Sequence, residues 1–185
     1  KYSVQKREEI RGSMGITDQF VIGHVGNFCY QKNHYFLLDV FEEVHKKDPN
    51  TVLLLAGDGV RFEKVRQIVA EKNLEDVVKL LGRRSDTDYL YQGMDAFLLP
   101  SNFEGLPIAG IEAQSAGLPC FMSDEITKES KITEACYFIP LKSGAKYWAE
   151  EILDNRIERQ SAEFLDNAQQ YDLANQDQEL KSLIR

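Results

Sequence analysis

Hydrophobic residues follow two alternating patterns along the chain. One pattern is a short, nearly continuous apolar run, which is typical of a strand buried on both faces of a parallel sheet. The other is helical spacing, as in Phe36, Val40 and Val44, which predicts an amphipathic helix. The runs predict strands at 20–26, 51–56, 77–81, 96–100, 119–122 and 136–139. The spacing predicts helices at 33–47, 62–69, 86–93, 107–116 and 148–153, and charged residues at 6–11 add a polar helix near the start.

Strands and helices therefore alternate about six times, joined by short turns that contain glycine or proline. This order predicts an α/β fold, namely a Rossmann-like, doubly wound parallel sheet of about six strands with helices on both faces. We expect the sheet and its helices to occupy 19–155, after a polar first segment at 1–18 and before a polar, helical tail at 156–185. Ligands of such sheets bind beyond the carboxyl ends of the strands, so the loops that follow the strands are the most informative segments.

Composition argues against several other classes of protein. The chain has 185 residues, which corresponds to roughly one domain. Its 22 basic and 30 acidic residues give a net charge of −8, which argues against a protein that coats nucleic acid. The chain has no apolar run long enough to cross a bilayer and no leader-like segment at its start. Three cysteines without a C-x-x-C pair argue against a disulfide scaffold or a zinc site and favour a reducing, cytosolic setting.

The loop after the first strand carries the first candidate chemistry. Gly26 would let a ligand approach the backbone, and Lys32 stands at the start of the next helix, where the helix dipole favours anions. These residues predict a phosphate-binding site, with a plain glycine turn and a surface lysine as the alternative. His24, inside the strand, is expected to be a core histidine, and His34 a polar residue at the helix start.

The next two loops give weaker signals. Gly57 and Gly59 form a G-x-G, but the third glycine of a dinucleotide fingerprint is missing, so we expect a simple turn. After the third strand, which ends at Gly82, Arg83 and Arg84 could face a nucleotide or only water. The D-x-D at 86–88 could hold a divalent metal, but we expect Ser85 or Asp86 to cap the following helix instead.

The segment after the fourth strand is the most informative one. Glu104 precedes a helix that begins at Pro107 and is almost wholly apolar, so we expect this helix to be buried with Glu112 as its single charge. A buried carboxylate is costly unless it is hydrogen-bonded, and a ribose or sugar diol would donate two hydrogen bonds to it. Glu104 stands beside backbone N–H groups that are free to bind phosphate at the helix start. The alternative is that Glu112 faces solvent and Glu104 is only a loop charge.

Four motifs in this order resemble a known enzyme family. They are VGNFCYQKN at 25–33, LLLAGDG at 53–59, LLGRRSD at 80–86 and the E-x7-E motif EGLPIAGIE at 104–112. Over residues 10–153 the chain resembles the C-terminal half of a retaining family 4 (group 1) glycosyltransferase with the GT-B fold. The resemblance is closest to the capsular and exopolysaccharide branch, through the segments 22–34 and 123–129.

This resemblance implies a function and a set of site residues. The C-terminal half of such enzymes binds a nucleotide-diphospho-sugar donor, whose glycosyl group passes to a polysaccharide or lipid-linked acceptor. Lys32 matches the lysine that contacts the donor diphosphate, Glu104 the glutamate near the donor sugar, and Glu112 the glutamate that binds the ribose hydroxyls. Lys32 and Glu104 are thereby implied as catalytic, and no metal or other cofactor is required. The other positions that match donor-binding loops are Gly26, Asn27, Gly57, Gly82, Arg83, Gly105, Leu106, Pro107 and Ile108.

The resemblance also implies what surrounds this half. The N-terminal acceptor domain of the family has no counterpart in this sequence, and residues 1–18 match the connection between the two domains. We therefore expect the chain to bind nucleotide but to transfer no sugar on its own. The family setting is cytoplasmic, and the full-length protein is expected to associate peripherally with the inner face of the membrane.

One position departs from the family pattern. The glycine of the first motif is usually followed by arginine, and Asn27 stands there instead, so one of two diphosphate cations is missing. The loss of a charge-assisted hydrogen bond of about 1.5–3 kcal/mol would weaken donor binding or rate roughly 10- to 150-fold. Either the chain binds donor weakly, or Arg83 or another basic group compensates. Asn27→Arg is expected to tighten binding of the nucleoside diphosphate.

Two other classes of function stay open. One is a degenerate, non-catalytic sugar-nucleotide-binding domain, which Asn27 would favour. The other is a Rossmann oxidoreductase domain, against which the incomplete G-x-G and the E-x7-E motif argue.

Overall fold

The structure, a computed structural model, describes residues 2–157 as one α/β unit. Its six strands form a single parallel sheet in the order β3-β2-β1-β4-β5-β6, which confirms the Rossmann-like expectation. Most predicted ends of strands and helices differ from the observed ones by one or two residues. Along the chain the elements are α1 (Val4–Ser13), β1 (Phe20–Val25), α2 (His34–Lys47), β2 (Thr51–Ala56), α3 (Phe62–Glu71), β3 (Val78–Gly82), α4 (Thr87–Gly93), β4 (Ala96–Leu99), α5 (Ile108–Ser115), β5 (Cys120–Ser123), the 3-10 turn η1 (Lys128–Ser130), β6 (Cys136–Ile139), the 3-10 turn η2 (Leu141–Ser143) and α6 (Gly144–Asp154).

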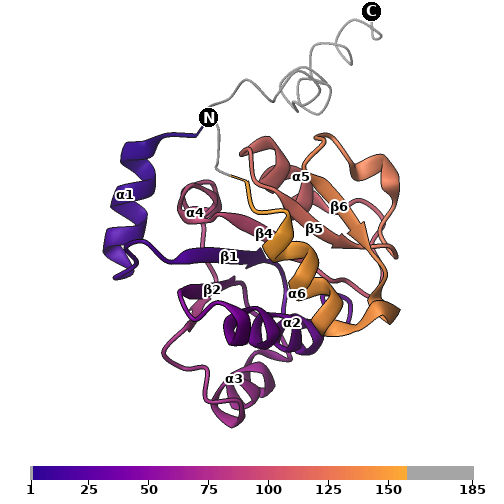
Figure 1. Cartoon of the computed structure of the whole chain (residues 1–185), viewed down its shortest axis with the longest axis horizontal. Helices are drawn as coiled ribbons and strands as arrows, with labels where there is room; N and C mark the ends of the chain where they lie inside the picture. The colour runs from indigo at the N-terminus through magenta and orange to yellow at the C-terminus, as the bar shows by residue number, and fades with distance from the viewer. Residues whose placement is uncertain (1, 158–185) are drawn as a thin grey trace, which may run out of the picture.

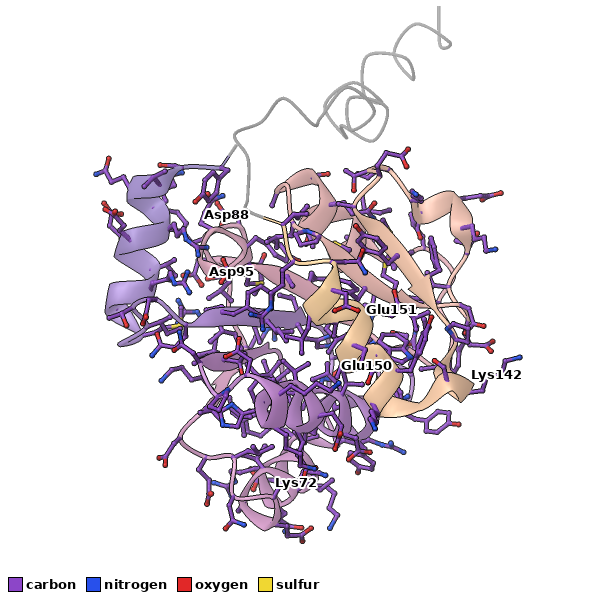
Figure 2. The ribbon with its side chains drawn as sticks, in the orientation of Figure 1. Lys72, Asp88, Asp95, Lys142, Glu150 and Glu151 are labelled. Carbon is purple, nitrogen blue, oxygen red and sulfur yellow. The ribbon has the colours of Figure 1, made fainter. Side chains whose placement is uncertain are left out.

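Each face of the sheet is covered by its own hydrophobic core. On one face, Leu53 and Leu55 of β2 pack in a core with residues of α2, α3 and α6. On the other face, Leu54 of the same strand packs in a core with residues of α1, α4 and α5. Helices α2 and α6 run side by side in front of the sheet, joined at their surface by the ion pair of Lys47 with Glu150 (Figures 1 and 2). Burial on both faces explains why the strands have continuous apolar sequences.

Helix α1, which forms most of the predicted first segment at 1–18, is attached to the rest of the fold through Asp95. This residue lies between α1 and the sheet (Figure 2) and accepts hydrogen bonds from Arg7, from Arg11 and from the backbone N–H of Val21. Of the predicted tail at 156–185, only residues 156 and 157 are among those described, so the expected helix there is outside the described residues. No helix within residues 2–157 is long and apolar enough to cross a membrane.

The order of the strands creates a topological switch point between β1 and β4. The chain moves outward from β1 to β2 and β3, and then returns to place β4 on the other side of β1. The loops at 26–33 and 100–107 therefore leave neighbouring strand ends toward opposite faces of the sheet, which is where ligands of doubly wound folds bind. The two loops are joined because Asn102 donates hydrogen bonds to the backbone oxygens of Gln31 (2.8 Å) and Tyr30 (2.7 Å).

Candidate functional site

The two residues predicted to be catalytic, Lys32 and Glu104, meet at this switch point. Lys32 Nζ forms an ion pair with Glu104 Oε1, although the two residues are 72 positions apart, and their side chains are only 15% and 5% exposed. Ser101 Oγ donates a second hydrogen bond to the same carboxylate oxygen, at 3.0 Å. Glu104 is therefore held by two side-chain hydrogen bonds, and it positions the side chain of Lys32 near the N-terminus of α2.

The prediction that Glu112 is buried is wrong. Glu112 is exposed, and so is Ile108 at 65%. The eight-residue helix α5 buries only the side that carries Gly110, Ala113 and Gln114. Two small residues and the polar Gln114 face the core while Ile108 faces outward, which differs from the arrangement expected of an apolar helix.

Tyr91, which the sequence did not single out, holds Glu112 in place. Its hydroxyl donates to Glu112 Oε2 at 3.0 Å and lies 3.3 Å from the backbone oxygen of Ala109. Burial and the negative charge of Glu112 raise the pKa of Tyr91, so this hydroxyl stays a donor at neutral pH. An exposed carboxylate oriented by a buried tyrosine is suited to accept hydrogen bonds from a diol, so the predicted role of Glu112 does not depend on burial.

The segment between Glu104 and α5 forms an exposed rim. Leu106 and Ile108 are exposed at 59% and 65%, Gly105 is exposed too, and Pro107 is buried. The ring of Phe103, itself 55% exposed, lies 6.5 Å from the ring of Tyr30 in the loop after β1. The rim thus brings apolar side chains and backbone together beside the lysine–glutamate pair.

Gly57 and Gly59 bring the loop after β2 against the loop after β1. A Cβ atom on Gly57 (φ +145°) would lie 1.9 Å from the backbone oxygen of Gly26, and one on Gly59 (φ +148°) would lie 2.2 Å from Asn27 Oδ1. The exposed Asn27 therefore leans over this second loop. Backbone hydrogen bonds from Phe28 to the oxygen of residue 58 (2.8 Å) and from residue 61 to the oxygen of Phe28 (2.9 Å) complete the junction. The G-x-G itself is irregular and the turn follows it at residues 60 and 61, so the turn predicted for the G-x-G lies just after it. Its glycines permit the close approach of two loops.

The loop after β3 lies two strands away from β1. Gly82 accepts a hydrogen bond from the N–H of Gly57 through its backbone oxygen, and Arg83 is exposed. Asp86 is the N-cap residue of α4, as predicted, but its side chain makes no cap hydrogen bond and pairs instead with Arg84, at 2.6 and 2.8 Å. Within residues 2–157, no group of three or more histidine, cysteine or acidic residues could hold a metal ion.

Two buried histidines lie beneath the site. His24 is a core histidine, as predicted, and donates from Nδ1 to the backbone oxygen of Leu98 at 2.8 Å. His34 is also buried, which the sequence analysis missed, and its ring stacks on Phe28 at 4.0 Å and meets His24 edge-on at 4.8 Å. Burial lowers the pKa of His24 to about 4. Burial and the nearby charges of His24 and Lys32 lower the pKa of His34 to about 2, so both rings are neutral at pH 7.

A parallel sheet with this strand order defines the class of Rossmann-like α/β domains. Residues 6–171 match the family model described as "Glycosyl transferases group 1". This match covers most of the chain, which therefore belongs to the group 1 glycosyl transferases, as the sequence motifs indicated.

Individual relatives agree with the family. The chain is 37% identical over 126 residues to the "Putative glycosyltransferase EpsF" of Bacillus subtilis (strain 168), covering 68% of this chain and 33% of that protein. It is 34% identical over 110 residues to the "UDP-Gal:alpha-D-GlcNAc-diphosphoundecaprenol alpha-1,3-galactosyltransferase" of Escherichia coli, covering 58% of this chain and 28% of that protein. The chain thus spans about a third of the length of these curated relatives.

A solved structure shares the fold over nearly the whole chain. The crystal structure of Anabaena Alr3699/HepE in complex with UDP and glucose superimposes with a TM-score of 0.79 at 20% identity, over 98% of this chain and 52% of that one. The neighbours are GT-B glycosyltransferases, and the chain corresponds to about half of the HepE chain.

Proposed function

We propose that this chain is the donor-binding half of a glycosyltransferase and that it binds a nucleotide-diphospho-sugar at the switch point between β1 and β4, beyond the carboxyl ends of these strands. One observation carries the proposal: Lys32 and Glu104 form an ion pair between the loops that follow β1 and β4, where the order of the strands reverses, in a chain that belongs to this family. Uridine diphosphate is the first nucleotide to test, because UDP stands in the descriptions of both the HepE structure and the Escherichia coli relative.

Each part of the site has a task in this proposal. Negative charge develops on the departing diphosphate during glycosyl transfer, and Lys32 with the positive end of α2 stabilises it. Glu104 positions Lys32 and lies next to the donor sugar. Glu112, oriented by Tyr91, accepts hydrogen bonds from the ribose hydroxyls. No step of this mechanism calls for a metal ion.

The acceptor completes the reaction in the full-length enzyme. We infer a polysaccharide or lipid-linked saccharide acceptor, in keeping with the diphosphoundecaprenol named for the Escherichia coli relative. The acceptor domain would lie in the part of the relatives that this chain does not span, so the chain alone would bind nucleotide without transferring a hexosyl group. Measurable transfer by this chain alone would contradict that part of the proposal.

Calorimetric titration of the chain with UDP, GDP, ADP and NAD, each without added metal, tests the binding function. We expect one nucleoside diphosphate to bind at micromolar to low-millimolar concentration and the binding to be lost in Glu112→Ala. The matched control is Glu75→Ala, since Glu75 is an exposed glutamate before β3, at the opposite edge of the sheet. Equal losses in both variants, or no binding of any diphosphate, would overturn the proposal, and binding of NAD alone would favour an oxidoreductase.

The second candidate is a non-catalytic sugar-nucleotide-binding domain. Asn27, which stands where the family pattern has arginine, is the observation that favours it. A full-length enzyme that binds the donor but neither transfers nor hydrolyses it would support this alternative over the catalytic one.

A further inference from the structure

The charge balance at the proposed diphosphate site is incomplete. A diphosphate carries at least two negative charges, and its binding sites normally supply cationic donors. Lys32 is already paired with the carboxylate of Glu104, and Asn27 is neutral. The positions that the family pattern assigns to the diphosphate are Lys32 and Asn27. Together with Glu104 they therefore supply little net positive charge.

Arg61 is the basic residue that the fold brings next to this loop. It follows Gly59 by two positions in the loop after β2, the strand adjacent to β1. Its backbone N–H donates to the backbone oxygen of Phe28 at 2.9 Å, and the side chain of Asn27 leans over Gly59 in the same loop. Arg61 thus emerges directly beside the position where the family pattern has an arginine.

The guanidinium of Arg61 is held without being neutralised. Its central carbon lies 5.1 Å from the ring centres of both Tyr30 and Tyr35, so two aromatic rings orient the cation. Among residues 2–157, no carboxylate lies within ion-pair distance of it, whereas the arginines at 66 and 84 are paired with neighbouring acids. A stacked arginine keeps its charge and its donors for a phosphate group.

Arg83, the other candidate for compensation, is less well placed. It follows β3, which is separated from β1 by the whole of β2, so about 10 Å of sheet lies between the ends of the two strands. The loop of Arg61, in contrast, is hydrogen-bonded to the loop of Asn27. The neighbouring strand is therefore the better source of the missing cation.

We propose that Arg61, oriented by Tyr30 and Tyr35, binds the donor diphosphate in place of the arginine that Asn27 replaces. The proposal rests on the proposed donor-binding function and adds a residue to it. In this proposal the arginine comes from the loop after β2 instead of the adjoining loop after β1, and the site still has two basic residues, Lys32 and Arg61.

Binding of UDP to the chain, measured by calorimetry without metal, tests this assignment with the variants Arg61→Gln, Asn27→Arg/Arg61→Gln and Arg83→Gln, and with Arg66→Gln as a control. We expect Arg61→Gln to weaken UDP binding at least about 10-fold, as the loss of one charge-assisted hydrogen bond implies. The double variant should recover to within about 3-fold of the wild type, because arginine returns to the position beside the diphosphate. Arg66→Gln is the matched control, because Arg66 is an exposed arginine of α3 that is paired with Glu63, and this variant should change the affinity less than about 2-fold.

Uridine separates a phosphate contact from a structural effect. Its binding, followed by saturation-transfer NMR, should be the same in the wild type and in Arg61→Gln, because uridine has no phosphate. An equal loss for UDP and uridine, no loss for UDP, or a loss in Arg83→Gln alone would overturn the assignment while leaving donor binding intact. A wild-type chain that binds no nucleoside diphosphate would overturn both this assignment and the proposed function.

Discussion

Acid should destabilise this protein through its two buried histidines. Unfolding exposes His24 and His34 to water, where each has its ordinary pKa of about 6.5, while burial lowers the pKa values in the folded protein to about 4 and about 2. The unfolded state therefore binds more protons than the folded state below pH 6.5. Because the folded-state values are the lower ones, stability is complete above pH 6.5 and falls as the pH drops toward 4.

The magnitude follows from proton linkage. At pH 5 both folded histidines are still largely neutral, while protonation favours the unfolded chain by about 2 kcal/mol for each ring. The two rings together lower the free energy of unfolding by about 4 kcal/mol between pH 8 and pH 5. A domain of this size is stabilised by roughly 5–15 kcal/mol in total, so the effect is large.

Urea unfolding at pH 5, 6, 7 and 8, at constant ionic strength and followed by circular dichroism, measures this loss. The comparison variant is His34→Phe, which keeps an aromatic ring on Phe28 and removes one titrating group. We expect the wild type to lose about 2 kcal/mol more than this variant between pH 8 and pH 5, whatever their difference at pH 8. Parallel pH profiles for the two proteins would refute the reasoning, because the acidic residues that titrate in this range are common to both.

Two further predictions concern residues around the site. Gly57→Ala should lower the free energy of unfolding by at least about 2 kcal/mol, because its Cβ would meet the backbone of the adjoining loop at a positive φ. Gly105→Ala, where nothing lies within 4 Å of the added atom, should stay within about 1 kcal/mol of the wild type, and equal urea midpoints for the two would contradict this account. Tyr91→Phe should weaken UDP binding roughly 3- to 10-fold, because the lost hydrogen bond orients the carboxylate of Glu112 and does not itself contact the nucleotide. Calorimetry checks this prediction, and an unchanged affinity would show that Tyr91 does not orient Glu112.

The fold was predictable from sequence because of the way it is buried. Strands covered on both faces have continuous apolar sequences, and their ends coincide with glycines and prolines that the backbone needs there. The reversal of strand order between β1 and β4 is a long-range property, so no local pattern could show that Lys32 pairs with Glu104. The sequence motifs identified Lys32 and Glu104 as candidates, but only the three-dimensional order of the strands shows that they form an ion pair.

The errors at α5 and α2 have different physical origins. In α5 the apolar composition suggested burial, but its inward side carries Gly110, Ala113 and the polar Gln114, while Ile108 faces solvent. Residue type alone does not tell which side of so short a helix is covered. At His34 a signal was present, because this residue continues the buried stripe of Leu37 and Phe41 at helical spacing.

The pairing of β1 with β4 also affects when the site can form during synthesis. Lys32 and its partner are 72 residues apart, so a growing chain completes β1 and the lysine loop long before β4 and the rim loop exist. During that interval β1 has an open edge, and closing it requires a long-range contact of the kind that slows folding. A nascent chain that ends before Ala96 can build half of the sheet and the lysine loop, but it lacks the residue that holds the lysine. Nucleotide binding would therefore begin only late in synthesis. Its onset would indicate that β4 has paired with β1.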